Sequence, residues 1–424
     1  MTPVILFDAS RLLSRTERST PTGIDRVCLA YAEWLMSHPD YQILPVRGRK
    51  GYPALVDASW FEDRVKELRQ RWNGGTASAL RPRDEALFSH LRQVTRPTSS
   101  LREDVPAQTP SSKSKPKNRA LRQYFRTRRV EALPKALAYL NVGHTGLDEP
   151  ELLKAVKGSG IAPIIMVHDL IPITHPEYCR EGDDAKHKKR ILHTLTYAAH
   201  VIANSQYTAD ELIKFATGTD ARPVPVTVAH LGVEAQLAQS EPFTTSRPYF
   251  VYVGTIEARK NLAFLLTVWR RLEETLGSDA PSLVIAGRFG WENESVIDLL
   301  ERSPNLQGLV HQISGLSDTA LAALMKGARA VVAPSSVEGF DLPAVEACAL
   351  GLPLLASDIP PHRELTPNAR LIDPIDGLGW LDAIIDWTKS APPTAAGNAP
   401  NWPDHFKIVE HEILSPLAGK LRGS

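Results

Sequence analysis

The sequence has little of what marks secreted, disulfide-bonded or membrane-spanning proteins. Its 424 residues include three cysteines, Cys28, Cys179 and Cys348, and no two of them form a Cys-x-x-Cys pair. This spacing predicts neither a zinc framework nor a disulfide framework, and it suits a reducing cytoplasm. No apolar stretch approaches the ~18–20 residues that a membrane-spanning helix needs, so any membrane association is expected to be peripheral.

Several other signals are missing. Residues 1–8 have no basic segment and only a short apolar run, which predicts a β-strand rather than a signal peptide. The formal net charge is +1, so no overall electrostatic field favours a nucleic-acid partner. The absence of Walker A, Gly-x-Gly-x-x-Gly and Gly-x-Ser-x-Gly motifs argues against an ATPase, a dinucleotide oxidoreductase and an α/β-hydrolase. No Asp-x-Asp is present to bridge a metal to a diphosphate, so no metal site is predicted.

Apolar, strand-like runs alternate with helical patterns through most of the chain, which predicts an α/β fold with parallel sheets. The runs are residues 4–7, 164–167, 200–203, 226–229, 249–253, 282–286 and 330–333. We expect one domain over residues 1–240, a linker within 234–248 and a second domain over 247–400. Residues 401–424 are predicted to form a terminal helix, because Phe406, Val409, Ile413 and Leu414 recur at helical spacing.

The most informative stretch is residues 334–353, which reads as a tight loop followed by a short helix. Pro343 suits the first helical position, and Gly351 suits the position that ends the helix. The backbone N–H groups of Phe340, Asp341 and Leu342 would then lie at the helix N-terminus, where unpaired donors and the helix dipole attract phosphate.

Glu338 and Glu346 flank this predicted phosphate site. Ionised carboxylates are hydrogen-bond acceptors, so they suit sugar hydroxyls rather than phosphate. Phosphate-binding amides beside hydroxyl-binding carboxylates indicate a nucleotide sugar as the ligand. The alternative is a capped helix with solvated glutamates, which is the better interpretation for Glu346 taken alone.

The run from Glu338 to Glu346 resembles the donor-site signature of retaining glycosyltransferases of family 4, which have the GT-B fold. A second block, residues 250–262, is similar to that family's first strand of the C-terminal domain and its diphosphate-binding loop, which here contains Arg259 and Lys260. The resemblance is specific over residues 249 to about 364 and implies two Rossmann-like domains with parallel sheets facing an inter-domain cleft. The N-terminal domain would bind the acceptor and the C-terminal domain the nucleotide sugar. The terminal helix would cross back to the N-terminal domain.

The resemblance also implies roles for individual residues. Glu338 would hold donor-sugar hydroxyls during catalysis, and Glu346 would bind the ribose. Diphosphate binding would fall to Arg259, Lys260 and the loop residues Gly339, Phe340, Asp341 and Leu342. Most family members have Gly in place of Asp341, and a carboxylate is unfavourable beside a diphosphate unless it points away.

Three further candidates lie in the N-terminal half. His168 follows a strand and matches a family histidine that touches the donor sugar, with Asp169 orienting it; the alternative is a structural His-Asp pair that caps the next loop. Gly23 and Arg26 open a helix whose entry is marked by Thr22 or Pro21. The resemblance implies that they lie at the cleft mouth near the phosphates and the acceptor, because many family members have a Gly-Ile-x-Arg element here, although Arg26 also suits a helix surface. Asn204 and Ser205 follow another strand, where a helix cap is the favoured role.

Residues 94–118 are rich in Pro, Ser, Thr and Lys and predict a mobile insertion, which with the basic stretch after it covers about 94–129. Residues 113–129 contain eight basic side chains and no acidic one: Lys113, Lys115, Lys117, Arg119, Arg122, Arg126, Arg128 and Arg129. The stretch is either a solvated basic helix start or a patch for anionic lipid headgroups or a lipid-diphosphate acceptor.

The predicted function is that of a metal-independent, retaining glycosyltransferase without a cofactor. It would move a hexose, with GDP-mannose as the preferred donor, to a glycan or lipid-linked glycan in surface polysaccharide synthesis. The expected location is the cytoplasm, either free or peripheral on the inner face of the plasma membrane. The alternatives are a same-fold sugar-nucleotide epimerase or phosphorylase and a non-catalytic sugar-nucleotide-binding scaffold.

Overall fold

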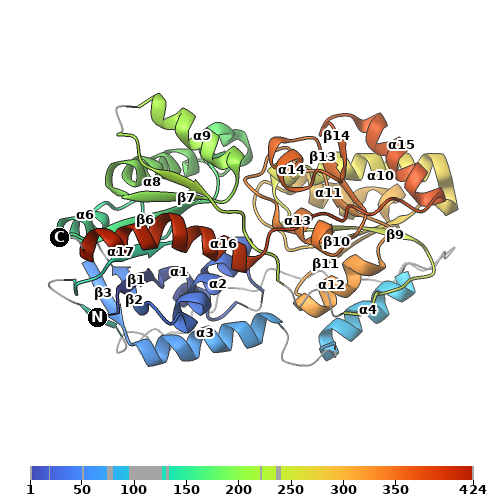
Figure 1. Ribbon diagram of the computed structural model, residues 1–424. Coiled ribbons are helices and arrows are strands. Elements are labelled where there is room, and N and C mark those ends of the chain that lie inside the picture. Colours follow the sequence, from blue (N-terminus) through green and yellow to red (C-terminus); the bar gives the residue numbers. More distant parts are fainter. Residues whose placement is uncertain are drawn as a thin grey trace.

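The computed structural model describes residues 2–18, 20–49, 52–73, 80–94, 127–129, 133–219, 222–234 and 240–422. Two sheets covered by helices lie side by side, one in each half of the molecule (Figure 1). Both are α/β layers, which confirms the predicted fold class. Each of the predicted strand runs falls on an observed strand, with ends that agree within two residues.

The first sheet has the strand order β4-β3-β2-β1-β5-β6-β7-β8. Its strands are β1 Val4–Asp8, β2 Gln42–Arg49, β3 Tyr52–Val56, β4 Thr127–Arg129, β5 Ala138–Asn141, β6 Ala162–Val167, β7 His200–Ala203 and β8 Val226–Val228. The sheet is not wholly parallel as expected, because β3 pairs antiparallel with both β2 and β4. The connection from β2 to β3 is too short for the crossover that parallel neighbours need.

The helices of this half follow the same alternation. They are α1 Ser10–Ser14, α2 Gly23–Ser37, α3 Ala58–Asn73, α6 Glu151–Gly158, α7 Ile171–Thr174, η1 Pro176–Tyr178, α8 Asp183–Tyr197 and α9 Gln206–Thr217. Thr22 caps α2 in a reciprocal capping box with Asp25, so Thr22 rather than Pro21 marks the entry of this helix. The side chain of Ser205 accepts from the N–H of Thr208 and caps α9, which confirms the cap preferred for that position.

The second sheet is entirely parallel and has the order β11-β10-β9-β12-β13-β14. Its strands are β9 Tyr249–Val253, β10 Ser282–Ala286, β11 Val310–Ile313, β12 Val331–Ala333, β13 Leu354–Ser357 and β14 Arg370–Ile372. The strand order therefore reverses direction between β9 and β12. Ligands of doubly wound sheets bind at the carboxyl ends of the strands beside such a reversal.

The helices of the second half are η3 Ala258–Lys260, α10 Leu262–Leu276, η4 Gly277–Asp279, α11 Glu294–Arg302, η5 Pro304–Leu306, α12 Asp318–Gly327, α13 Leu342–Ala349, α14 Pro360–Leu365 and α15 Gly377–Lys389. Because α13 begins at Leu342, Pro343 occupies its second position rather than the first as predicted. Gly351 has φ +66° just after the C-cap residue, as expected for the glycine that ends a helix.

Helix α4 (Pro82–Val94) departs from the expectation that residues 1–240 form one domain. Its Phe88 is buried and stacks on Phe243, with ring centroids 4.2 Å apart, inside the hydrophobic core of the second half. Its Asp84 is fully buried and accepts hydrogen bonds from the N–H and Oγ of Ser317, the N-cap of α12, at 3.3 and 2.7 Å. Figure 1 shows α4 beside α12. The domain boundary is wrong for this helix, because its apolar face and its buried carboxylate find their partners on the other half.

The chain ends in a long helix that lies against the first half (Figure 1). It consists of α16 Trp402–Val409, a π-helical turn η6 Glu410–Leu414 and α17 Ser415–Arg422. Phe406 stacks between Trp34 of α2 and Trp402, with centroids 4.4 and 5.4 Å away. Tyr31 of α2 and His405 are hydrogen-bonded at 2.7 Å. The terminal helix thus follows the second half in the sequence but packs on the first half.

None of the helices in the described ranges combines the length and the apolar character that a bilayer crossing requires. The predicted insertion and most of the basic stretch lie outside the described residues, apart from strand β4. Both predictions therefore stand on the sequence alone.

Candidate active site

The candidate site lies where the strand order of the second sheet reverses, at the carboxyl ends of β9 and β12. The loop after β9 carries Arg259 and Lys260, and the loop after β12 carries Glu338. Arg259 Nη1 lies 2.5 Å from Glu338 Oε2, and Lys260 Nζ lies 2.6 Å from Glu338 Oε1. A backbone hydrogen bond from Ser336 to Arg259, 2.8 Å long, ties the two loops together.

Burial disfavours the charged forms of Arg259 and Lys260, but neighbouring carboxylates favour them. Burial lowers the pKa of Arg259, yet Glu338 and Glu257 outweigh it and raise the pKa above its ordinary value. The pKa of Lys260 is also raised, because Asp341 and Glu338 outweigh burial. Both cations are therefore fixed in the charged state. Glu338 Oε1 is buried beside Lys260 and forms no directed hydrogen bond.

Asp341 stands at the N-cap of α13 in a left-handed backbone conformation, with φ 63° and ψ 69°. Its carboxylate does not cap the helix. One oxygen lies 2.9 Å from Lys260 Nζ, and the other lies 3.0 Å from His362 Nε2. The carboxylate thus turns away from the helix N-terminus. Within the described part of the chain, the backbone N–H groups of Phe340, Asp341 and Leu342 have no recorded acceptor and are open to an anion.

The loop of the second half makes close contact with the first half at Gly339. A Cβ atom on Gly339 would collide with the carbonyl oxygen of His168, so this approach requires glycine. The Oγ of Ser205 donates to the carbonyl oxygen of Gly339 at 2.7 Å. A Cβ on Gly23, the first residue of α2, would lie 3.1 Å from Leu342. The structure therefore gathers Gly23, His168, Gly339 and Leu342 at one seam between the halves.

His168 is buried, and its Nε2–H donates to the carbonyl oxygen of Val142 at 2.8 Å. Burial lowers the pKa of His168 to about 4, so the ring is neutral at ordinary pH. The carboxylate of Asp169 accepts from the N–H of Ile171 at 3.1 Å and caps the following loop. Asp169 therefore does not orient His168 through the hydrogen bonds of the described residues, and the loop-capping alternative holds for this carboxylate.

Arg26 is not on a helix surface, the alternative considered for it. Its guanidinium forms two hydrogen bonds to Asp318 of α12, 2.6 and 2.7 Å long, across the seam. The charges of Arg26 and Asp318 also act on Glu346. Burial raises the pKa of Glu346 to about 7, partly offset by the charge of Arg26. The carboxylate predicted to bind ribose therefore shares its surroundings with the arginine predicted at the cleft mouth.

Three residues of the site and its seam escaped the sequence interpretation: Asp318, His362 and Glu364. The carboxylate of Glu364 accepts from the backbone N–H groups of Gln206 and Tyr207, at 2.6 and 3.1 Å, at the start of α9. Glu364 lies at the end of the stretch covered by the family resemblance. No local pattern distinguishes these side chains from surface charges, because their partners are far away in the sequence.

The structure offers one group of potential metal ligands among the described residues, and it lies away from the strand ends. His38, Asp40 and Glu410 place their ligand atoms within 4.8 Å of one another. His38 Nδ1, however, accepts from the N–H of Asp40 at 3.1 Å, which leaves the proton of a neutral ring on Nε2, the nitrogen facing Glu410. This tautomer has no free Nε2 lone pair for a metal.

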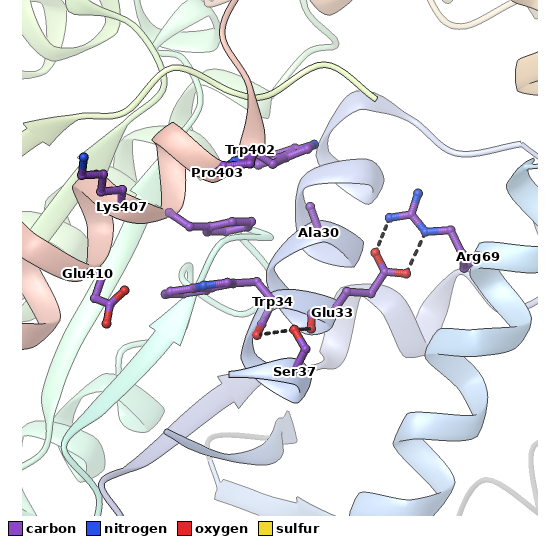
Figure 2. Close-up of a pocket in the computed structure, with 10 residues that line it drawn as sticks. Ala30, Glu33, Trp34, Ser37, Arg69, Trp402, Pro403, Lys407 and Glu410 are labelled. Carbon is purple, nitrogen blue, oxygen red and sulfur yellow. Dashed lines mark hydrogen bonds and ion pairs between the residues drawn. The ribbon is translucent and has the colours of Figure 1, made fainter. Parts of the chain in front are cut away.

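A cavity of about 430 Å³ lies near the same place rather than at the predicted site. Figure 2 shows Trp34 and Trp402 stacked with the ring between them on one side, and the ion pair of Glu33 with Arg69 on the other. None of the predicted site residues lines this cavity. The cavity has charged lining residues of its own, Glu33, Arg69, Lys407 and Glu410. The candidate site is assigned to the seam because its cations and carboxylates converge where the strand order of the second sheet reverses.

Comparisons with known proteins give a family match for the second half of the chain. Residues 233–390 match the family model of glycosyl transferases group 1. The chain is 29% identical over 235 residues to the serotype-specific mannosyltransferase WbdA of Escherichia coli, a match covering 51% of this chain and 29% of WbdA. It is 30% identical over 226 residues to O-antigen chain mannosyltransferase B of Escherichia coli, covering 51% of this chain and 58% of that protein. The matches thus span less than two thirds of either relative.

A solved structure extends the likeness to the whole fold. The crystal structure of HepE from Anabaena in complex with UDP-glucose superimposes with a TM-score of 0.57 at 14% identity, over 100% of both chains. At this identity the likeness establishes the fold alone. The chain therefore carries a glycosyl transferases group 1 domain within a GT-B fold, and its relatives over about half its length are bacterial mannosyltransferases.

Proposed function

We propose that the chain is a retaining glycosyltransferase of family 4. It would transfer mannose from GDP-mannose to a glycan or lipid-linked glycan in surface polysaccharide synthesis. The observation that carries this proposal is the cluster of Arg259, Lys260 and Glu338 at the strand reversal. Gly339, the residue after Glu338, meets the backbone of His168 across the seam. The mannosyltransferase relatives support the sugar, and the O-antigen name of one of them supports the pathway class.

The cluster suits a donor that carries both a diphosphate and a sugar. An entering diphosphate would compete with the carboxylates for Arg259 and Lys260, since both cations bind phosphate oxygens well. Glu338 would then be released from the cations to accept hydrogen bonds from the donor sugar. As the diphosphate leaves with its negative charge, the same cations and the open amides at the start of α13 stabilise it.

We propose that this stabilisation needs no metal ion. Two fixed cations and a helix N-terminus supply positive charge where other transferases use a bridging metal. We further propose that residues 113–129 bring the protein to anionic membrane, where a lipid-linked acceptor would lie. Reversing four of these charges should reduce binding to vesicles that contain anionic lipid, since each basic residue near such a surface is worth about 1 kcal/mol.

A donor screen tests the proposal. Purified protein is incubated with UDP-, GDP- and ADP-hexoses, and the release of nucleoside diphosphate is measured for each one. GDP-mannose should give the fastest release, and Arg259→Ala should lose it. Arg302→Ala is a matched control, because Arg302 is an exposed arginine paired with Asp298 on α11. Conversion of a nucleotide sugar to its epimer without diphosphate release would instead indicate the epimerase, and no turnover with any donor would contradict the proposal. Anomeric configuration of the product, read by NMR, tests retention.

A further inference from the structure

A cluster of arginines lies on the short segment that follows strand β1. Arg11 of helix α1 donates from Nε to Asp25 Oδ1 at 2.7 Å, and Arg15 Nε lies 3.5 Å from the same oxygen. The other oxygen of Asp25 accepts from the N–H of Thr22 at 2.9 Å. One fully buried carboxylate is thus shared by two arginines. Within the described ranges, Arg15 Nε is buried without a hydrogen-bond partner.

Arg18 adds a third cation to this cluster. Its carbonyl oxygen accepts from Trp72 Nε1 at 3.1 Å, so helix α3 holds its backbone in place. Its guanidinium is in no ion pair with any of the described residues. Burial lowers the pKa of Arg18, and repulsion from Arg288 and Arg11 lowers it further, whereas Asp25 opposes these effects. Two arginines and a single described carboxylate therefore act on this side chain.

Arg15 is in the same situation. Burial lowers its pKa, and Arg11 and Arg18 lower it further, while Asp25 has the opposite effect. An arginine stays charged at ordinary pH despite such a shift. Glu17 of the same segment is exposed and is not among the charges that act on Arg18. The cluster thus holds more positive charge than the carboxylate inside it neutralises.

Other half-buried arginines of the first half have their charge matched. Arg26 has Asp318 as its partner, and Arg69 has Glu33 and Glu234. Burial would lower the pKa of both arginines, but these carboxylates outweigh burial and raise it. A buried charge is costly unless it is paired. The unmatched cations of the cluster therefore indicate an anionic ligand.

Arg288 faces the cluster from the second half. It lies in the loop after β10, where its carbonyl oxygen accepts from the N–H of Ile256 at 2.9 Å. The same loop reaches the first half, because Trp291 Nε1 donates to the carbonyl oxygen of Tyr178 at 3.4 Å. Arg288 is in no ion pair within the described ranges, and it lies near enough to repel Arg18. Two like charges thus meet across the seam.

The cluster lies beside the predicted donor-sugar site and is separate from the predicted diphosphate site. The charge of Arg11 acts on His168, the histidine predicted to touch the donor sugar. Arg259 and Lys260, by contrast, are not among the charges that act on Arg18. An anion held at the cluster would therefore be a second one, additional to the donor diphosphate. In a transferase, the molecule that lies beside the donor sugar is the acceptor.

We propose that Arg15, Arg18 and Arg288 bind the phosphate or diphosphate group of the acceptor, which makes the substrate a phosphate-linked glycan precursor rather than a neutral glycan. This inference rests on the proposed function and narrows its acceptor. Guanidinium groups match phosphate oxygens with paired hydrogen bonds. A diphosphate between the halves would neutralise the repulsion of Arg18 and Arg288, and a neutral glycan would leave that repulsion in place.

The first experiment measures anion binding. Calorimetry gives the Kd of inorganic pyrophosphate in the presence of saturating GDP, which occupies the donor diphosphate site. Arg18→Gln/Arg288→Gln should raise this Kd by about tenfold or more, because charge-assisted contacts are lost. The matched control Arg271→Gln/Arg302→Gln removes two exposed arginines of α10 and α11 and should bind as the wild type does. Equal Kd values in the wild type and in Arg18→Gln/Arg288→Gln would overturn the inference.

Melting temperatures distinguish ligand binding from a structural role. Arg18 and Arg288 repel each other, so Arg18→Gln/Arg288→Gln should melt at the wild-type temperature or above it when no ligand is present. Pyrophosphate should raise the melting temperature of the wild type more than that of the variant, because a ligand stabilises the state that binds it. A large fall in the melting temperature of the unliganded variant would show that these arginines stabilise the fold, and the inference would then be wrong.

Geranyl diphosphate distinguishes a linked diphosphate from a free anion. Its Kd, measured in the same way, should be no higher than that of pyrophosphate, and it should rise in Arg18→Gln/Arg288→Gln. Binding of geranyl diphosphate that is weaker than that of pyrophosphate by about tenfold or more would show a site for free anions only. The acceptor part of the inference would then fail.

The proposed donor is tested separately, because GDP binding is measured first on the same protein. If GDP does not bind, the proposed donor fails, and the pyrophosphate titration is repeated without GDP in Arg259→Ala, with and without the changes at Arg18 and Arg288. That comparison still decides whether the cluster binds an anion. If GDP binds and the Kd of pyrophosphate is the same with and without Arg18 and Arg288, the donor site stands and the second anion site is refuted.

Discussion

Arg26 and Asp318 join the two halves of the molecule through a two-point ion pair, although 292 residues separate them in the sequence. Their side chains are only 18% and 12% exposed, so the pair is largely removed from water. Arg26 also lowers the otherwise raised pKa of Glu346. Removing this arginine would leave two carboxylates without their main cation at the seam.

We expect Arg26→Ala to destabilise the protein by about 3 kcal/mol, because breaking a buried pair leaves an uncompensated charge. The measurement is the melting temperature in parallel with chemical denaturation. Arg302→Ala removes an exposed partner of Asp298 and should change stability by less than about 1 kcal/mol. Equal losses of stability in the two variants would show that the ion pair between the halves contributes no more than an exposed one.

The two glutamates of the motif should differ in their kinetic roles. Glu338 would contact the reacting sugar, and that contact strengthens as charge develops, so Glu338→Gln should lower kcat by about tenfold or more. Glu346 would contact ribose about equally in the ground and transition states, so Glu346→Gln should mainly raise the donor KM. Steady-state kinetics of both variants, with folding checked by melting temperature, decide this. Wild-type kinetics in both variants would mean that residues 338–346 form only a capped helix and do not bind the donor.

Glu346 should also make stability depend on pH. Its folded-state pKa of about 7 exceeds the ordinary value of 4.5, so the folded protein holds a proton that the unfolded chain has already released. Stability should therefore fall as the pH rises from about 4.5 to about 7, by roughly 3 kcal/mol in total. The melting temperature of Glu346→Gln should lack this part of the decline.

Asp8 gives a comparison for this pH effect. Burial raises the pKa of Asp8 to about 6, which has the same sign, but Asp8 is not among the predicted donor-binding residues. Saturating donor should reduce the part of the slope that Glu346 contributes and leave the part from Asp8, which Asp8→Asn removes. A slope in Glu346→Gln as steep as in wild type would exclude the titration of this carboxylate.

Chelation should not abolish activity. The proposed diphosphate site has Arg259 and Lys260, both with pKa values raised by neighbouring carboxylates, and these cations take the place of a metal. Nucleoside diphosphate release should therefore continue in excess EDTA. Complete loss, with recovery on adding Mg²⁺ or Mn²⁺, would contradict the proposed metal independence.

The sequence was sufficient for three strands of the second sheet, β9, β10 and β12, and for the loops that follow β9 and β12. Strands β9 and β10 have the predicted bounds, because each is a short apolar run with clear ends. Arg259, Lys260 and Glu338 converge because carboxyl ends of neighbouring parallel strands meet at one edge. The family resemblance identified these residues, and the chemistry of their side chains explains which part of the donor each would bind.

Contacts between segments that are distant in the sequence could not be predicted from local patterns. Asp341 lies 81 residues from Lys260 and 21 from His362, and nothing in their spacing signals a shared charge. The antiparallel strand β3 depends on pairing that alternation of elements does not specify. Helix α4 has an ordinary amphipathic pattern, which shows that a face is buried without showing against which half.

The position of α4 changes what counts as a separable unit of this protein. A fragment starting near residue 240 would include the whole second sheet and yet expose Phe243 and leave the N-cap Ser317 without the carboxylate of Asp84. Conversely, the remaining fragment would carry an apolar helix surface without its partner. The donor-side unit is therefore discontinuous in sequence, and independent folding of either half would require residues 80–94 to be joined to the second half.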